Sequence, residues 1–266
     1  MKIVIGISII ALLLIPTIHA QTDIDKDNDM VANALCQKLE TAFQLSSNEY
    51  LEQFFTNWNE SVTQNASEFI KQNDIVEAIY EIYKEVFNPF DLNMFGNIGK
   101  NNDLNCKYVV VSNKIYYSVI ENTLMEISDF DYMNAYKQDS INDFRPPLKM
   151  AKEQTLYLLP EYEKALDKFV GVEFVKSGRR FIKKWLYHKP GNRERYEFLR
   201  PYIPIHSGHW GGMYHTSQPF IYHIILDKNI SYARVSISIH DWGYGVILKK
   251  EANVWKIVKS ELIFMT

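Results

Sequence analysis

The chain has few cysteines, few glycines and no excess of charge of either sign. Its 266 residues include 2 Cys and 11 Gly, and 29 Lys and Arg against 32 Asp and Glu leave a net charge of -3. Two cysteines are too few for a disulfide-rich scaffold. Nucleic acid is not an expected partner, because phosphate binding normally requires a basic surplus. With 47% hydrophobic and 14% aromatic residues, the composition is typical of a globular protein with a substantial core.

The common catalytic motifs are also missing. The sequence contains no G-x-S-x-G, no H-E-x-x-H, no Walker loop and no G-x-G-x-x-G. We therefore expect no cofactor, and we favour a non-enzymatic protein over an enzyme.

The longest apolar run lies at the N-terminus. Lys2 is followed by thirteen apolar residues, "IVIGISIIALLLI", then by Pro16 and the small residue Ala20. Such a run is short for a bilayer span, so it predicts a secretory signal peptide over residues 1–20, with an uncleaved membrane anchor as the alternative. The mature chain is then expected to be secreted or periplasmic, with no membrane contact after cleavage near Ala20.

Apolar spacing predicts helices in the N-terminal half. Residues 21–30 are polar and predict a flexible leader, and residues 31–266 a single domain. Stripes of helical period follow in residues 31–43, 51–62 and 75–86. A capping box from Ser46 to Glu49 should open the second helix, and Asp74 the third. Two later helices are predicted, at 160–171 and 177–192.

Strand patterns dominate the C-terminal part. "FIYHIILD" (220–227) predicts one strand, and "YARVSISI" (232–239) alternates apolar with polar residues. Residues 245–264 predict two strands joined at Glu251–Asn253. Residues 106–121 are β-rich, and their central "SNK" could make a hairpin. Helices followed by an antiparallel sheet indicate an α+β fold, in which we expect the helical N-terminal half to pack on a strongly curved antiparallel sheet.

Residues 232–264 resemble the closing strands of nuclear transport factor 2-like proteins, which include ketosteroid isomerase-like and polyketide cyclase-like members. That resemblance implies a strongly curved antiparallel sheet around a helix-lined pocket. A ketosteroid isomerase-like enzyme would need a carboxylate base, a tyrosine and a protonated acid, and such a set does not align with this chain residue by residue. "HWGGMYH", "LPEYEKAL" and "NDIVEAIYEIYKEVF" look like parts of a group of secreted bacterial proteins without assigned function, which implies kinship only.

The stretch "HSGHWGGMYH" (206–215) is the first candidate site. Its three histidines, His206, His209 and His215, would suit a metal ion such as zinc. On a strand, however, His209 and His215 share one face, whereas His206, Trp210 and Tyr214 lie on the other. Gly211-Gly212 favours a structural bend over a metal site.

The stretch "HDWGYG" (240–245) is the second, and its glycines predict a turn or bulge. We expect a pocket beside these two bends that binds a small molecule, or else contact with an envelope or extracellular protein. Its expected ligand-binding residues are aromatic or imidazole side chains: Trp210, Tyr214, His240, Trp242 and Tyr244. In the alternative, an enzyme, His209 or His215 would be the acid–base group, supported by Asp241 or Tyr214.

Cys36 and Cys106 leave two alternatives open. In an exported protein they could pair, which would close a loop of about 70 residues. They could equally serve as separate small hydrophobic residues.

Overall fold

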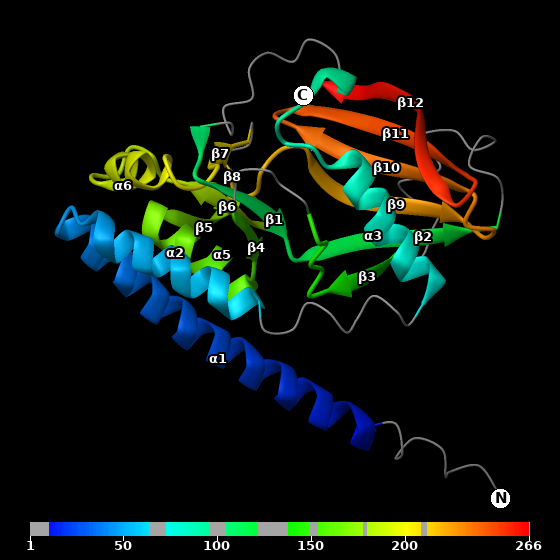
Figure 1. The fold of residues 1–266 in the computed structure, drawn as a ribbon. Coiled ribbons are helices and arrows are strands. Elements are labelled where there is room, and N and C mark those ends of the chain that lie inside the picture. Colours follow the sequence, from blue (N-terminus) through cyan, green and yellow to red (C-terminus); the bar gives the residue numbers. More distant parts are fainter. Residues whose placement is uncertain are drawn as a thin grey trace, which may run out of the picture.

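The computed structural model describes residues 11–63, 73–95, 105–121, 138–148, 154–177, 180–208 and 212–265. Helices and a large sheet form an α+β protein (Figure 1), as expected. The helices are α1 (Ala11–Gln44), α2 (Asn48–Thr63), α3 (Asp74–Val86), α5 (Pro160–Val170), α6 (Asn192–Leu199) and the short 3-10 helix η1 (Asn93–Phe95). Within these ranges no helix has the length and apolar character that a bilayer span requires.

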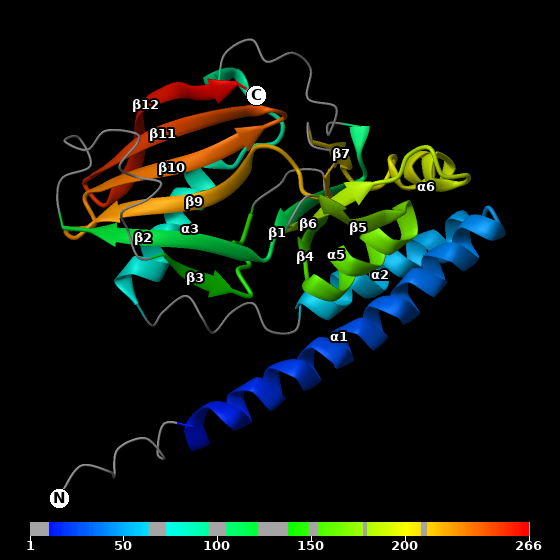
Figure 2. The same cartoon turned by 180° about the vertical axis from the view of Figure 1, so that it is seen from behind.

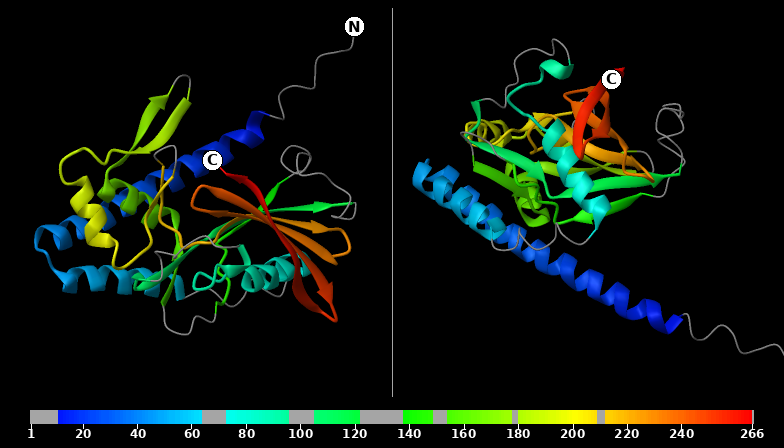
Figure 3. Two further views of the ribbon diagram at one scale, coloured as in Figure 1. Left: turned by 90° about the horizontal axis from the view of Figure 1, so that it is seen from above. Right: turned by 45° about the vertical axis from the view of Figure 1, so that its right-hand side comes forward.

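In the part of the chain that the structure describes, the large sheet has six strands in the order β12-β11-β10-β9-β2-β3. Its strands are β2 (Lys114–Ile120), β3 (Asp139–Asn142), β9 (Phe220–Asp227), β10 (Tyr232–Ile239), β11 (Trp242–Glu251) and β12 (Val254–Met265). The pairs from β9 to β12 are antiparallel, as predicted, but β2 lies parallel to β9. The sheet is therefore mixed rather than antiparallel, and it is not strongly curled (Figure 3).

Helix α3 covers one face of this sheet (Figure 1). The predicted alternation of β10 is confirmed, because Ala233, Val235, Ile237 and Ile239 are all fully buried in the core that α3 shares. The N-cap of α3 is Asn73 rather than Asp74, since the Asn73 side chain accepts a hydrogen bond from the Ile75 amide.

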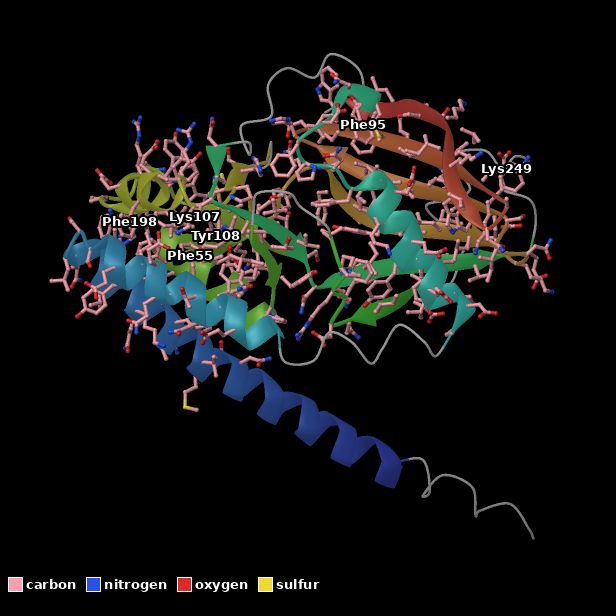
Figure 4. All side chains as sticks on the ribbon, viewed as in Figure 1. Phe55, Phe95, Lys107, Tyr108, Phe198 and Lys249 are labelled. Carbon is pink, nitrogen blue, oxygen red and sulfur yellow. The ribbon has the colours of Figure 1, made fainter. Side chains whose placement is uncertain are left out.

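Helices α1, α2, α5 and α6 form a second layer with the parallel strands β1 (Tyr108–Ser112) and β4 (Gln154–Leu158). The aromatic stripe of α2 packs here: Phe55 stacks on Tyr108 at 4.9 Å, and Trp58 stacks on Tyr162 at 4.6 Å between ring centroids. Phe55 and Tyr108 are labelled in Figure 4, on the opposite side of the molecule from Phe95. The N-terminal helices α1 and α2 thus pack on α5 and β4. We expected them to pack on the large sheet, and for these two helices that prediction is wrong.

Residues 106–121 do not form a hairpin. Strand β1 pairs with β4, whereas β2 pairs with β3 and β9, and only Asn113 separates β1 from β2. Each strand finds its partner elsewhere, so the chain passes from one sheet directly into the other. Tyr157 of β4 packs against both hydrophobic cores and links them.

The helix predicted over 177–192 is wrong, because residues 186–191 form a connection of turns and bends and α6 begins only at Asn192. Strands β5 (Val172–Ser177) and β6 (Arg180–Trp185) form an antiparallel hairpin instead. Lys183 Nζ lies 2.8 Å from Asp167 Oδ2, and Trp185 Nε1 donates to the Val170 carbonyl at 2.9 Å. Lys183 and Trp185 are two residues apart on β6, so their side chains lie on the same face of the strand, and both contact α5.

Helix α1 begins at Ala11 and passes through residues 21–30, for which we expected a flexible leader. Its N-terminal part extends away from the rest of the molecule (Figure 2). A cut near Ala20 remains a prediction. The structure contains no disulfide between Cys36 and Cys106; the Cys106 thiol instead lies 3.4 Å from the Arg200 carbonyl oxygen.

Candidate functional site

The stretch 206–215 folds into a tight hairpin. Strands β7 (His206–Ser207) and β8 (Met213–Tyr214) pair so that His206 lies opposite Tyr214, and the Gly208 amide donates to the Gly212 carbonyl at 2.8 Å. Opposite residues of a ladder share a face, so His206 and Tyr214 point the same way and His215 points the other way. His209 and Trp210 lie outside the described residues.

A cavity of about 790 Å³ lies between this hairpin, β6, α6 and one face of the large sheet. Its walls come from segments far apart in the sequence, and they are mainly aromatic, imidazole and hydroxyl side chains. The lining residues include Lys183, Tyr196, Arg200, His206, Ser207, Tyr214, Thr216, Gln218, Phe220, Tyr222, Ser238, His240, Asp241 and Phe264.

Two aromatic rings of the cavity wall pack closely against glycines. A Cβ added to Gly208 would sit 2.8 Å from the Tyr214 ring, and one added to Gly243 would sit 2.2 Å from the Phe264 ring. Any other residue at these two positions would displace the ring. The hairpin and β12 thus each present a ring to the cavity, and Tyr214 is 54% exposed.

The two bends named from the sequence meet at this cavity. The rings of His206 and His240 are 6.1 Å apart and nearly perpendicular. His240 and Asp241 form the two-residue turn between β10 and β11, where His240 adopts a φ of 52°. The turn is therefore at His240–Asp241, and Gly243 and Gly245 belong to strand β11.

Charged groups of both signs line the cavity: Lys183, Arg200 and Asp241. Arg200 forms a long contact of 3.5 Å with Glu197. Burial would lower the pKa of the Lys183 ammonium, but its hydrogen bond and attraction to Asp167 prevail and raise that pKa. The Lys183 ammonium therefore stays charged through the neutral range.

His215 does not belong to the cavity wall. Its side chain is buried, and its Nε2 lies 2.9 Å from Asp167 Oδ1 on α5. Burial would raise the pKa of the Asp167 carboxyl, but the hydrogen bonds and charges of His215 and Lys183 prevail and lower it. The structure thus places Asp241 and Tyr214 on the cavity, and His215 behind its wall.

Two other predicted ligand residues, Trp242 and Tyr244, lie on the face of β11 that points away from the cavity. Tyr244 is buried in the core with its ring 5.2 Å from Phe95, and Trp242 lies beside Tyr244 at 6.5 Å. Neither lines the cavity, because side chains at even positions of β11 point towards η1 and α3.

The contributions of Tyr196, Arg200 and Phe264 were missed. Tyr196 and Arg200 belong to a short helix region with no distinguishing pattern, and Phe264 lies in an ordinary strand pattern. Tyr222 carried a usable signal, since it is an aromatic residue on a strand next to the first bend.

The predicted metal set is not assembled by the described residues. His206 and His215 lie on opposite faces of the hairpin, and His209 lies outside the described part. Among the residues that the structure describes, no group of three His, Cys, Asp or Glu side chains is placed to hold a metal ion.

No protein-family model matches this chain, and neither a curated protein nor a solved structure matches it significantly. The class defined by the fold is therefore the broad one: an α+β protein with a mixed six-stranded sheet and a cavity beside one face of that sheet.

Proposed function

We propose that this protein is an exported, non-enzymatic binding protein that holds a small organic ligand with a flat ring in the cavity beside hairpin β7–β8. The observation that carries the proposal is the pair of rings, Tyr214 and Phe264, each lying on a glycine and each lining the same cavity from a separate element. A ring that lines the cavity can stack on a flat ligand, and ring stacking adds about 0.5–1.5 kcal/mol beyond the buried area.

The size of the cavity suits such a ligand. Its volume of about 790 Å³ lies within the roughly 300–1,000 Å³ that is common for small-molecule sites. The polar side chains Ser207, Thr216, Gln218 and Ser238 line it and can bind the edge of the ring. Lys183 is already paired with Asp167 and Glu163. Among the described residues Arg200 has only a long contact of 3.5 Å with Glu197, so Arg200 is the cation of the wall that favours a ring with an acidic group.

Export is part of the proposal, and it rests on the apolar run that follows Lys2. Expression of the full chain with its own N-terminus should yield mature protein outside the cytoplasm, beginning near Gln21. N-terminal sequencing checks the cut. Recovery of only the uncut chain in the membrane fraction would instead support the anchor.

We also propose a distant relationship of the C-terminal strands to nuclear transport factor 2-like proteins. Its support is the antiparallel run β10–β12, with α3 across one face. The parallel β2–β9 pair departs from an antiparallel cone. Intermediate sequences that align continuously with both would establish the relationship, and their absence from a wide set of homologues would remove it.

Binding can be tested with the fluorescent probe 8-anilinonaphthalene-1-sulfonate, a flat aromatic anion. The mature chain should bind it saturably, and Tyr214→Ala should weaken the affinity about 2- to 10-fold, the range expected for one lost ring contact. Tyr50→Ala is the matched control, because Tyr50 is 50% exposed on α2 and does not line the cavity.

Circular dichroism of each variant ensures that binding reports on folded protein. Equal affinities for the wild type and Tyr214→Ala, or no saturable binding by the wild type, would contradict the proposal.

A further inference from the structure

Asp167 holds two walls of the cavity with one carboxylate. It lies on α5 and is 7% exposed. Its Oδ1 lies 2.9 Å from His215 Nε2, and its Oδ2 lies 2.8 Å from Lys183 Nζ. Each oxygen thus serves a different segment of the chain.

The two partners of Asp167 flank the cavity. His215 follows Tyr214 directly, and Tyr214 is a cavity residue at the end of β8; Lys183 is itself a cavity residue on β6. Strands β6 and β8 are neighbours, and Figure 1 shows both beside α5. A carboxylate in this position fixes the hairpin and β6 relative to the same helix.

Hairpin β7–β8 depends on Asp167 for its polar contact with α5 more than strand β6 does. His215 is 2% exposed, and its Nδ1 has no hydrogen-bond partner among the described residues, so the contact of Nε2 with Asp167 is the polar anchor of this ring. Lys183 has a second carboxylate, Glu163, at 3.0 Å. Loss of the Asp167 carboxylate leaves Lys183 with a partner, whereas it leaves the buried His215 ring with none that the described residues provide.

We propose that Asp167 is the positioning residue of the ligand cavity: it anchors hairpin β7–β8 through His215 and β6 through Lys183, and so sets the place of Tyr214 on the wall. It does not line the cavity itself. The effect on ligand affinity rests on the proposed function, whereas the anchoring of the hairpin does not.

The test compares Asp167→Asn with Glu163→Gln by hydrogen exchange of residues 212–217. Asp167→Asn should raise the exchange of these amides about tenfold or more relative to the wild type, because two contacts of a buried carboxylate are replaced by at most one neutral hydrogen bond, with the amide nitrogen facing either His215 or Lys183. Glu163→Gln removes the other partner of Lys183 and leaves the contact with His215 intact, so the exchange should stay unchanged. Amides of α3, in the other core, should be unchanged in both variants.

Two further readouts separate positioning from general destabilisation. The ring 15N signals of His215 should shift in Asp167→Asn and not in Glu163→Gln. In a His215→Asn background, Asp167→Asn should add no further exchange in residues 212–217, since the contact is already lost. If Asp167→Asn does not fold, His215→Asn alone should reproduce the loosened hairpin.

Affinity for 8-anilinonaphthalene-1-sulfonate completes the test and should fall several-fold in Asp167→Asn only. Unchanged exchange of residues 212–217 in folded Asp167→Asn would overturn the role of Asp167. If Asp167→Asn does not fold, unchanged exchange of these residues in His215→Asn would overturn it instead. A loosened hairpin in a protein whose wild type binds no probe would overturn the proposed function and leave the anchoring role intact.

Discussion

The ring of Phe264 on β12 lies across the backbone of Gly243, its partner in the β11–β12 ladder. A methyl group at position 243 would occupy the space of that ring, at 2.2 Å from Phe264 Cε1. Gly243→Ala should therefore push Phe264 into the cavity, lower the free energy of unfolding by about 1–3 kcal/mol, as overpacking does, and weaken probe binding.

Gly212→Ala is the control for this substitution. A Cβ at Gly212 would meet the Tyr214 hydroxyl at 3.7 Å, an ordinary contact, so stability should change little. Urea unfolding gives the free energy of unfolding of both variants. Equal losses for Gly243→Ala and Gly212→Ala would contradict the prediction that the ring of Phe264 needs a glycine at position 243.

The fully buried indole of Trp58 should be the most sensitive position of the helical layer. Its ring stacks on Tyr162, and its Nε1 donates to the Tyr157 carbonyl at 2.9 Å. Trp58→Ala should cost about 3–5 kcal/mol, because a large cavity and a lost hydrogen bond combine. Trp58→Phe, which keeps most of the ring, should cost clearly less. Denaturant unfolding decides this, and a loss below about 1 kcal/mol for Trp58→Ala would contradict the packing.

Asn73 caps α3, which covers the large sheet. Asn73→Ala removes the acceptor of the Ile75 amide and should lower the free energy of unfolding by about 1 kcal/mol. Asn73→Ser, which retains a capping oxygen, should be close to wild type in the same unfolding experiment. If alanine and serine behave alike, the cap contributes nothing measurable.

His223 should make stability depend on pH. It is buried beside Ser118, with 3.1 Å between His223 Nε2 and Ser118 Oγ, and burial lowers its pKa from 6.5. The unfolded chain then binds the proton more readily, so the contribution of His223 is complete above about pH 6.5 and is lost as the pH falls towards the lowered pKa. His223→Gln should show a smaller fall in unfolding free energy between pH 7.5 and 5.5 than wild type. Identical pH slopes would exclude His223 as the source.

Local patterns predicted the elements whose contacts are local. Strand β10 and the β11–β12 hairpin follow from an alternation of period two and a turn at Ala252–Asn253, where both residues have positive φ. Helix α5 follows from Pro160 at its start and Gly171, with φ 82°, at its end. Each of these signals lies within the element that it defines.

Distant contacts decided the elements that were predicted wrongly. Strand β6 carries a basic, aromatic sequence that also suits a helix, and its extended form depends on α5, which binds Lys183 and Trp185. Strand β1 left the expected hairpin because β4 supplies its partner. No pattern within either segment contains this information.

The candidate site was predicted in part for the same reason. His206, Tyr214, His240 and Asp241 line the cavity because the two bends they occupy lie next to each other. The roles of Asp167 and Phe264 depend on contacts of α5 with β8 and of β12 with β11, which the sequence around these residues does not show.

The parallel contact between β2 and β9 has a consequence for the order in which the chain folds. Ser118 and His223, which touch across this pair, are 105 residues apart in the sequence. The hairpins of β9 to β12 involve only near neighbours and can form quickly, whereas joining β2 to them requires closure of a very long loop. We expect insertion of β2 to be the slow step, so the open edge of β9 is the place where a newly made chain is most exposed to pairing with another.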